Sequence, residues 1–385
     1  MISLKTAVSF FRSHRRKIAI FALLGTALYS AYRLRKAYNN LRLQLDATSS
    51  ERLSTLHKKF ETCQRTIVLT TYSFLPLLKS RLWELTQVEN TVRQLKASEA
   101  QTEHRKQDLW EKLKIETFTR VICGAYALSL LFVVVTLKVS LLGRYLTEEL
   151  RVPFTEVPSS ELAEDELGKL FQELRNLQSN LSIHKGTQQA YLDITCTCLD
   201  SFLDILVGRV KTSVEKVLVH TRVTQTVDTD FWNSAVVAIR EDIETVVPDV
   251  ENSYSFAAFP PLMAEQELRT VETGTLETKG VNRDSLIALL NETADIIEEA
   301  DFREVLTEVV EIVFEILRKQ VSSFTEASTK ITSAQLLPKI QSVVSQVFLD
   351  STSNSYIHAI SELDCVENFA AVIFLSGEKY EPSEG

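Results

Sequence analysis

The segment DFREVLTEVVEIVFEILR, residues 301–318, decides the class of fold. Its apolar residues return every three or four positions, which is the spacing of one face of an α-helix, and glutamates lie among the positions between them. Asp301 and Glu304 have the spacing of a capping box with Asp in place of Ser or Thr, so we expect the helix to begin there. The apolar stripe consists of Val305, Val309, Ile312, Val313 and Ile316.

The helical spacing continues in both directions from this segment. Glycine and proline number only 10 and 8 among 385 residues, well under the average combined usage of about 12 per cent, and a sheet-rich fold would need more turns. We therefore predict an all-α fold, an elongated bundle of long helices. The helices are expected at residues 39–95, broken near Pro76, and at residues 107–150, 161–219, 231–247, 285–299, 336–347 and 357–372.

One stretch interrupts the pattern, from Pro248 to Asp284. It contains Pro260-Pro261 and scattered Ser, Thr and Gly, so we interpret it as an extended surface loop. Residues 150–160, with Pro153 and Pro158, form a connection. Neither stretch is a clear linker, so residues 46–385 are predicted to be one helical domain, built as one large core or as two intimately packed parts. This domain is expected to be soluble and largely monomeric by itself.

The N-terminal stretch HRRKIAIFALLGTALYSAYRLRK, residues 14–36, has a different character. Its uncharged run, residues 18–32, is 15 residues long and ends in basic residues rather than in a clear cleavage site. A retained membrane anchor is the favoured interpretation, because flanking Arg and Lys stems can reach the interface and the bilayer can thin. A cleaved secretory signal and a buried helix are the alternatives. Residues 1–45 thus form a basic segment with an anchor.

The charge distribution supports this division. Residues 1–45 contain nine Lys and Arg and no acid, and because the whole chain carries −9, the remaining residues carry −18. A basic segment suits an anionic membrane face, whereas an acidic domain argues against non-specific nucleic-acid binding. The positive-inside rule gives no orientation, since five cations precede the run and four follow it.

A second apolar stretch, residues 121–143, is also a candidate for a membrane-spanning helix. Its longest uncharged run is 17 residues, at the lower limit for a membrane span. The preceding residues run into it without a helix break, which favours a helix buried in the core. The alternative is a two-span organelle membrane protein or a helical membrane tether.

Neither cysteines nor motifs indicate catalysis. The five cysteines show no disulfide-framework spacing, which suits a reducing compartment, and Cys196 and Cys198 are interpreted as core residues rather than a metal or redox pair. The chain has no Gly-rich phosphate loop, no HExxH and no GxSxG, and its six histidines are scattered. We predict a protein that is not an enzyme and has no cofactor, metal ion or small-molecule substrate.

Three motifs resemble those of the peroxin-3 family. They are LWEKLKIETFTR at 109–120, LLNETADIIEEADFREVL at 289–306 and VENFAA at 366–371. Judged by the order of these motifs and the basic N-terminal segment, the resemblance extends over roughly residues 10–375. The resemblance implies a peroxisomal membrane protein whose bulk faces the cytosol. It also implies docking of peroxisomal biogenesis factor 19, the soluble receptor and chaperone for new membrane proteins, through an amphipathic helix of that partner. The run at 18–32 is then the anchor, and Arg15, Arg16 and Lys17 belong to the targeting signal.

The resemblance also implies a binding site around Trp110. At 100° per residue, Lys106, Trp110 and Lys114 share one face of the helix. The opposite face, with the larger apolar continuation, is expected to enter the core, leaving Trp110 on an exposed apolar spot flanked by cations; the alternative is that Trp110 packs on a neighbouring helix. The core face consists of Ile115, Phe118 and Ile122, and the further candidates for the site are Leu109, Leu113, Leu95 and Lys96.

Overall fold

A computed structural model describes residues 50–97, 103–149, 183, 185–245, 255–274, 281–326, 331–351 and 353–376. The predicted anchor at 18–32 and the basic cluster at 15–17 lie outside the described residues. The chain forms two compact units, residues 1–60 and 61–385. The described part of the first unit is the beginning of one helix, and the second unit holds the core and the candidate site.

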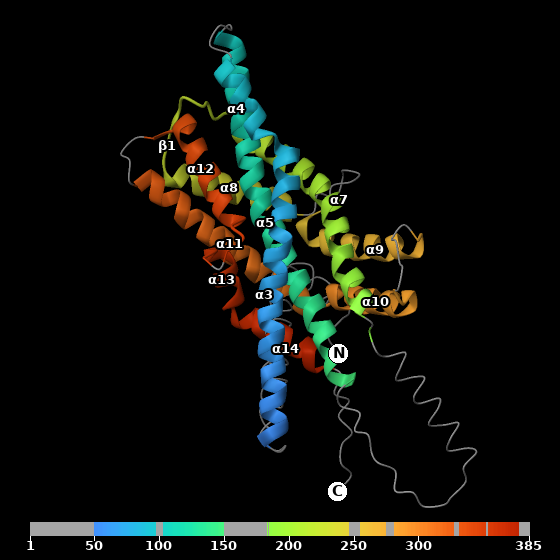
Figure 1. Ribbon diagram of the computed structural model, residues 1–385. Coiled ribbons are helices and arrows are strands. Elements are labelled where there is room, and N and C mark those ends of the chain that lie inside the picture. The colour runs from blue at the N-terminus through green and yellow to red at the C-terminus, as the bar shows by residue number, and fades with distance from the viewer. Residues whose placement is uncertain are drawn as a thin grey trace, which may run out of the picture. The chain divides into compact units, whose positions relative to one another are not determined.

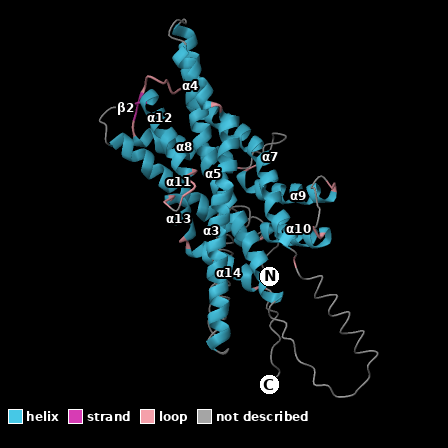
Figure 2. Cartoon of the chain, in the orientation of Figure 1, coloured by secondary structure: helices cyan, strands magenta, loops and turns pink. Residues whose placement is uncertain are grey.

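The described residues are almost entirely helical, as predicted (Figure 2). The only strands in the described ranges are β1 (Thr226–Val227) and β2 (Ile331–Thr332), which pair antiparallel. A short 3-10 turn, η2 (Phe256–Ala258), precedes α9. The helices are α3 (Ser50–Thr86), α4 (Val88–Ala97), α5 (Glu103–Glu149), α7 (Lys185–Leu218), α8 (Thr229–Glu244), α9 (Phe259–Glu272), α10 (Arg283–Glu298), α11 (Ala300–Glu326), α12 (Ser333–Val347), α13 (Ser355–Ser361) and α14 (Asp364–Leu375).

Helix α5 forms the centre of the second unit (Figure 1). It packs against α4, α7, α11, α12 and α14, and every residue from Thr117 to Leu142 is buried. Among the described residues, one helix is long and apolar enough to cross a membrane, and it is this one; its apolar window lies entirely inside the fold. The favoured interpretation of residues 121–143 as a core helix therefore agrees with the structure.

The break expected near Pro76 lies elsewhere. Helix α3 continues through Pro76 and ends at Thr86, and the following Gln87 takes the left-handed conformation with φ 43°. A proline inside a helix loses one backbone hydrogen bond. Leu75, Leu78 and Leu82 bury the same side of α3 across this point, and we attribute the continuity of the helix to that packing.

The surface loop predicted for Pro248–Asp284 is wrong for its central part. Residues 259–272 form α9, with Pro260 in the first turn, where the missing N–H has no helical partner to lose. Phe259, Met263 and Val271 are buried. The prolines and polar residues of this stretch resemble a loop, although its buried residues pack as one short helix face.

Two helix ends differ from the sequence prediction. Helix α11 begins at Ala300, which places Asp301 inside the first turn, where its charge complements the helix dipole rather than capping the end. The helix expected through residues 357–372 is two helices, because Leu363 is extended (φ −70°, ψ 125°) between α13 and α14. The predicted helices at 285–299 and 336–347 correspond to α10 and α12, and α12 begins with a capping box of Thr332 and Gln335.

Candidate partner-binding face

Helices α4 and α5 bring the candidate residues of the docking site to one end of α5. Thr91 of α4 donates to Glu116 of α5 at 2.6 Å, and Glu89, two residues earlier, accepts from Arg120, four residues later. These contacts define an antiparallel pair. Leu95 and Lys96, further along α4, therefore lie beside the first turns of α5. We call Leu95, Lys96, Lys106, Leu109 and Trp110 together the Trp110 face.

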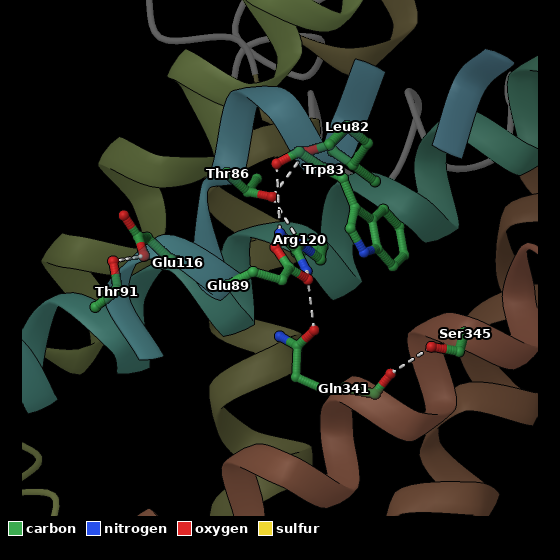
Figure 3. Close-up of polar contacts among 9 residues, drawn as sticks. All are labelled: Leu82, Trp83, Thr86, Glu89, Thr91, Glu116, Arg120, Gln341 and Ser345. Atoms are coloured by element: carbon green, nitrogen blue, oxygen red, sulfur yellow. Dashed lines mark hydrogen bonds and ion pairs between the residues drawn. The ribbon is translucent and has the colours of Figure 1, made fainter. Parts of the chain in front are cut away.

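A buried guanidinium fastens this helix pair to the rest of the fold (Figure 3). Arg120, which is fully buried, holds both carboxylate oxygens of Glu89 at 2.5 and 2.8 Å and donates through Nε to Thr86 at 2.7 Å. It donates also to the Gln341 side chain of α12 at 3.2 Å and lies 4.4 Å from the centre of the Trp83 ring. One side chain of α5 thus joins α3, α4 and α12.

The charge of Glu89 is part of this arrangement. The hydrogen bond from Arg120 lowers the pKa of the Glu89 carboxyl below its ordinary value, against a smaller opposing effect of burial. Glu89 is therefore ionised at neutral pH, and the bidentate pair is a charge-assisted contact that fixes geometry as well as energy.

Trp110 lies half-buried at the surface of this end. Within the described ranges its indole has no hydrogen bond or ring contact, whereas Trp232 is fully buried and packs on Phe118 at 5.2 Å between ring centres. Leu95, Lys106 and Leu109 are also half-buried, and Lys96 is exposed. A large aromatic side chain with an unused N–H donor is suited to an apolar contact with one polar anchor.

The structure places Leu113 and Lys114 below this surface. Leu113 is 6% exposed and Lys114 is 2% exposed, so the expected exposed flank does not include the Lys114 ammonium. Its Nζ donates to Glu111, to the Leu218 carbonyl at 3.2 Å and to the Thr221 carbonyl. The carbonyls at the end of α7 need donors, and an ammonium has three. Helical spacing alone could not predict the contact between Lys114 and the end of α7, because the two lie 104 residues apart in the sequence.

The opposite face of α5 enters the core as predicted. Phe118 and Ile122 are buried, and Ile115 is half-buried. Whether Leu95, Lys96, Lys106, Leu109, Trp110, Leu113 and Lys114 bind a partner stays a prediction. The structure brings the first five of these residues together at one end and assigns Lys114 a supporting contact.

The cysteines lie apart from this face. All five are free thiols, and burial raises the pKa of Cys196 to about 11 and of Cys198 to about 12, so both are protonated at neutral pH. Within the described part of the chain, no group of three or more His, Cys, Asp or Glu is placed to hold a metal ion.

Sequence reasoning did not foresee an open groove of about 830 Å³ along α3. Phe132 of α5 contributes to it and lies 22 residues from Trp110, which is about 33 Å along a helix. The groove is thus separate from the Trp110 face. Its walls include Ile67, Val68 and Leu69 of α3 and Val366, Glu367 and Ala370 of α14.

The fold and these surfaces define a helical scaffold whose exposed features suit the binding of other molecules. The peroxin-3 family model matches residues 9–108 and 96–376, so the chain belongs to the peroxin-3 family. It is 24% identical to human peroxisomal biogenesis factor 3 over 395 residues, covering 96% of this chain and 97% of that protein.

The similarity extends to other animals and to plants. The mouse peroxisomal biogenesis factor 3 is 23% identical over 400 residues, covering 96% of this chain and 97% of that protein. Peroxisome biogenesis protein 3-2 of Arabidopsis thaliana is 22% identical over 379 residues, covering 95% and 97%. Family membership confirms the resemblance, assigns the chain to peroxisome biogenesis and supports a role other than that of an enzyme.

Proposed function

We propose that this protein is the peroxisomal membrane docking receptor for peroxisomal biogenesis factor 19, and that the Trp110 face receives an amphipathic helix of that partner. The observation that carries the proposal is the half-buried Trp110, whose indole has no hydrogen bond or ring contact in the described ranges, beside the half-buried Leu95 and Leu109. Docking delivers new membrane proteins for insertion and requires binding energy but no chemistry.

The physical character of the face supports this occupant. An amphipathic helix binds by laying an apolar stripe on an apolar surface, with anchors at helical spacing. Trp is enriched among the residues that dominate binding energy, because it offers a large rigid area and one N–H donor. The Arg120 contacts hold α4 against α5, so the two helices that carry the face are ordered before binding.

The proposal includes a membrane location. Residues 18–32 would anchor the chain in the peroxisomal membrane with residues 46–385 in the cytosol, and Arg15, Arg16 and Lys17 would belong to the targeting signal. Replacing these three cations with Ser is expected to reduce peroxisomal localisation in cells. Unchanged localisation would contradict this part of the proposal.

The decisive experiment measures the affinity of the full chain, in detergent micelles, for purified peroxisomal biogenesis factor 19. Trp110→Ala is expected to weaken binding at least about tenfold, because truncating such an anchor typically costs about 2 kcal/mol. The thermal melt should stay within a few degrees, because Trp110 is only half-buried and makes no polar contact in the described residues.

A matched control is Phe74→Ala, another half-buried aromatic. Phe74 lies on α3 between Cys63 and Leu82. Cys63 contacts Val139 of α5, and Leu82 lies beside Gly124 of α5, so Phe74 lies opposite the part of α5 between these two residues. It is therefore at least about 20 Å along α5 from Trp110 and should not affect binding. If Trp110→Ala binds with unchanged affinity, the docking site does not include Trp110. If that variant unfolds, the side chain of Trp110 serves packing and not docking.

A further inference from the structure

The residues at the end of α7 contact α5 one helical turn from Trp110. Lys114 stands one helical turn after Trp110 on α5, and its ammonium holds the carbonyls of Leu218 and Thr221. Val219 and His220 lie between these two carbonyl groups in the chain. We call residues 218–222 the α7 end. The buried Lys114 thus ties the α7 end to the helix that carries Trp110.

The α7 end is fixed on both sides. The Thr221 N–H donates to the Leu218 carbonyl at 3.1 Å, which closes the last turn of α7. Just beyond, the Val223 carbonyl accepts from Ala334 and the Gln225 carbonyl from Ser333, each at 2.9 Å, at the beginning of α12. A segment held in this way loses little conformational freedom when a partner binds.

This ordered segment exposes an apolar side chain. Val219 is 66% exposed, the largest value among the exposed large hydrophobic residues in the described ranges, while its neighbours Leu218 and Thr221 are buried. A single exposed apolar residue is ordinary, but this one follows Leu218, whose carbonyl accepts from Lys114 one helical turn from Trp110. The two apolar groups can form one surface, since the elements that carry them meet at Lys114.

The charges around this surface sum to a small positive value. Residues 88–97 carry +1, from Arg93 and Lys96 against Glu89. Residues 103–116 of α5 carry equal numbers of acidic and basic residues, including Glu111 paired with Lys114, and residues 215–222 carry +1, from Lys216 and Arg222 against Glu215. The remaining chain is acidic, with −18 over residues 46–385. A local cationic surface on an acidic domain favours a partner with acidic side chains and repels other acidic surfaces.

We propose that the α7 end is a second wall of the docking face, with Val219 as its apolar contact and Arg222 as its charged rim. The inference rests on the proposed function and defines its ligand more closely. The occupant is an amphipathic helix whose apolar stripe is flanked by Asp or Glu, lying across Trp110 and Val219 together. Lys114 is a positioning residue, because it acts through the carbonyl groups that it holds.

The test compares variants of the full chain in binding to purified peroxisomal biogenesis factor 19. Val219→Asp introduces a charge at an exposed position and is expected to weaken binding roughly fivefold or more with an unchanged melt. Leu69→Asp is the matched control, because Leu69 is 65% exposed and lies on the separate groove along α3. Arg222→Glu should weaken binding more at low salt than at high salt.

Trp110→Ala, measured in the same series, separates the two proposals. If Trp110→Ala weakens binding and Val219→Asp does not, the second wall is overturned and the proposed function remains. If Val219→Asp weakens binding and Trp110→Ala does not, the assignment of docking to the Trp110 face fails, and with it this shared surface. Equal losses in Val219→Asp and Leu69→Asp would also overturn the inference, because the effect would not be local.

Discussion

Helix α5 contains two regions with opposite roles. From Thr117 to Leu142 every residue is buried, including the charged Arg120 and Lys138. From His104 to Lys112 no residue is buried, and Trp110 has no polar partner in the described ranges. The same helix is therefore core along one part and surface along the other, and a change in each part should affect a different property.

The difference shows why an apolar run of spanning length is ambiguous. Lys138 lies just after the uncharged run of residues 121–137 and is 1% exposed, yet it has a full set of partners. Its ammonium contacts both oxygens of Glu267 at 2.8 Å, the Thr195 hydroxyl at 2.7 Å and the Tyr191 carbonyl at 3.2 Å. Such compensation by α7 and α9 belongs to a packed protein interior.

The largest expected effect is on the buried region. Lys138→Met leaves the Glu267 carboxylate buried without its cation, which should lower the free energy of unfolding by about 3–5 kcal/mol. Urea unfolding of residues 46–385, followed by far-UV circular dichroism, measures the loss. Binding of peroxisomal biogenesis factor 19 by the fraction that remains folded should be unchanged, since Lys138 lies about 42 Å along the helix from Trp110.

A double variant is the control for this prediction. Lys138→Met combined with Glu267→Leu removes both charges and should recover most of the stability, because an apolar pair of similar size is often as stable as a buried ion pair. If the double variant is as unstable as Lys138→Met alone, the loss comes from packing and not from the unpaired carboxylate.

Arg120 lies in the buried region, near the end that adjoins the surface region, and should affect both properties. Arg120→Met removes the contacts to Glu89, Thr86 and Gln341, and we expect a loss of about 2–3 kcal/mol in unfolding free energy. The loss is smaller than for Lys138 because the Glu89 side chain is 51% exposed and can turn to water. Partner affinity should fall as well, because α4 is no longer held. Unchanged affinity at reduced stability would mean that α4 contributes nothing to the face.

Much of this fold could be predicted from the sequence, and the omissions have one physical origin. The amphipathic helices α10, α11 and α12 follow from local spacing, since each has an apolar stripe and a polar face. Helix α9 was missed because its prolines look like turn residues and Glu267 looks like a solvated acid, whereas its partner Lys138 lies 129 residues away. Pairings between distant charged residues leave no periodic signal.

The candidate site shows the same limit. Spacing placed Lys106, Trp110 and Lys114 on one face, and Phe118 and Ile122 in the core as the structure has them. It could not show that the α7 end covers Lys114 or that Val219 stands beside it. These residues become neighbours only through the packing of α7 against α5.

The pH dependence of stability should originate partly at the junction of α4 and α5, where Glu89 pairs with Arg120. Arg120 lowers the pKa of Glu89, so the pair contributes stability that is present above the ordinary value of 4.5 and is lost as the pH falls through the lowered value. Unfolding free energies measured between pH 3 and 6 should therefore fall less steeply on acidification in Glu89→Gln than in the wild type. Identical slopes would show that the carboxylate charge does not stabilise this junction.

The smallest effect compares one glycine at the end of the buried region with one on an exposed face. Gly208 of α7 is exposed, and a β-carbon added there meets no atom within 4 Å. Gly208→Ala should therefore raise the unfolding free energy by about 0.5–1 kcal/mol, because alanine loses less conformational entropy in a helix. At Gly143 of α5 the added carbon would lie 2.9 Å from the Phe374 ring and 3.3 Å from the Cys63 sulfur. Displacing that ring should cancel the same gain or exceed it. Equal stabilisation by both substitutions would show that the ring moves freely, and that the close packing of α5 ends before Gly143.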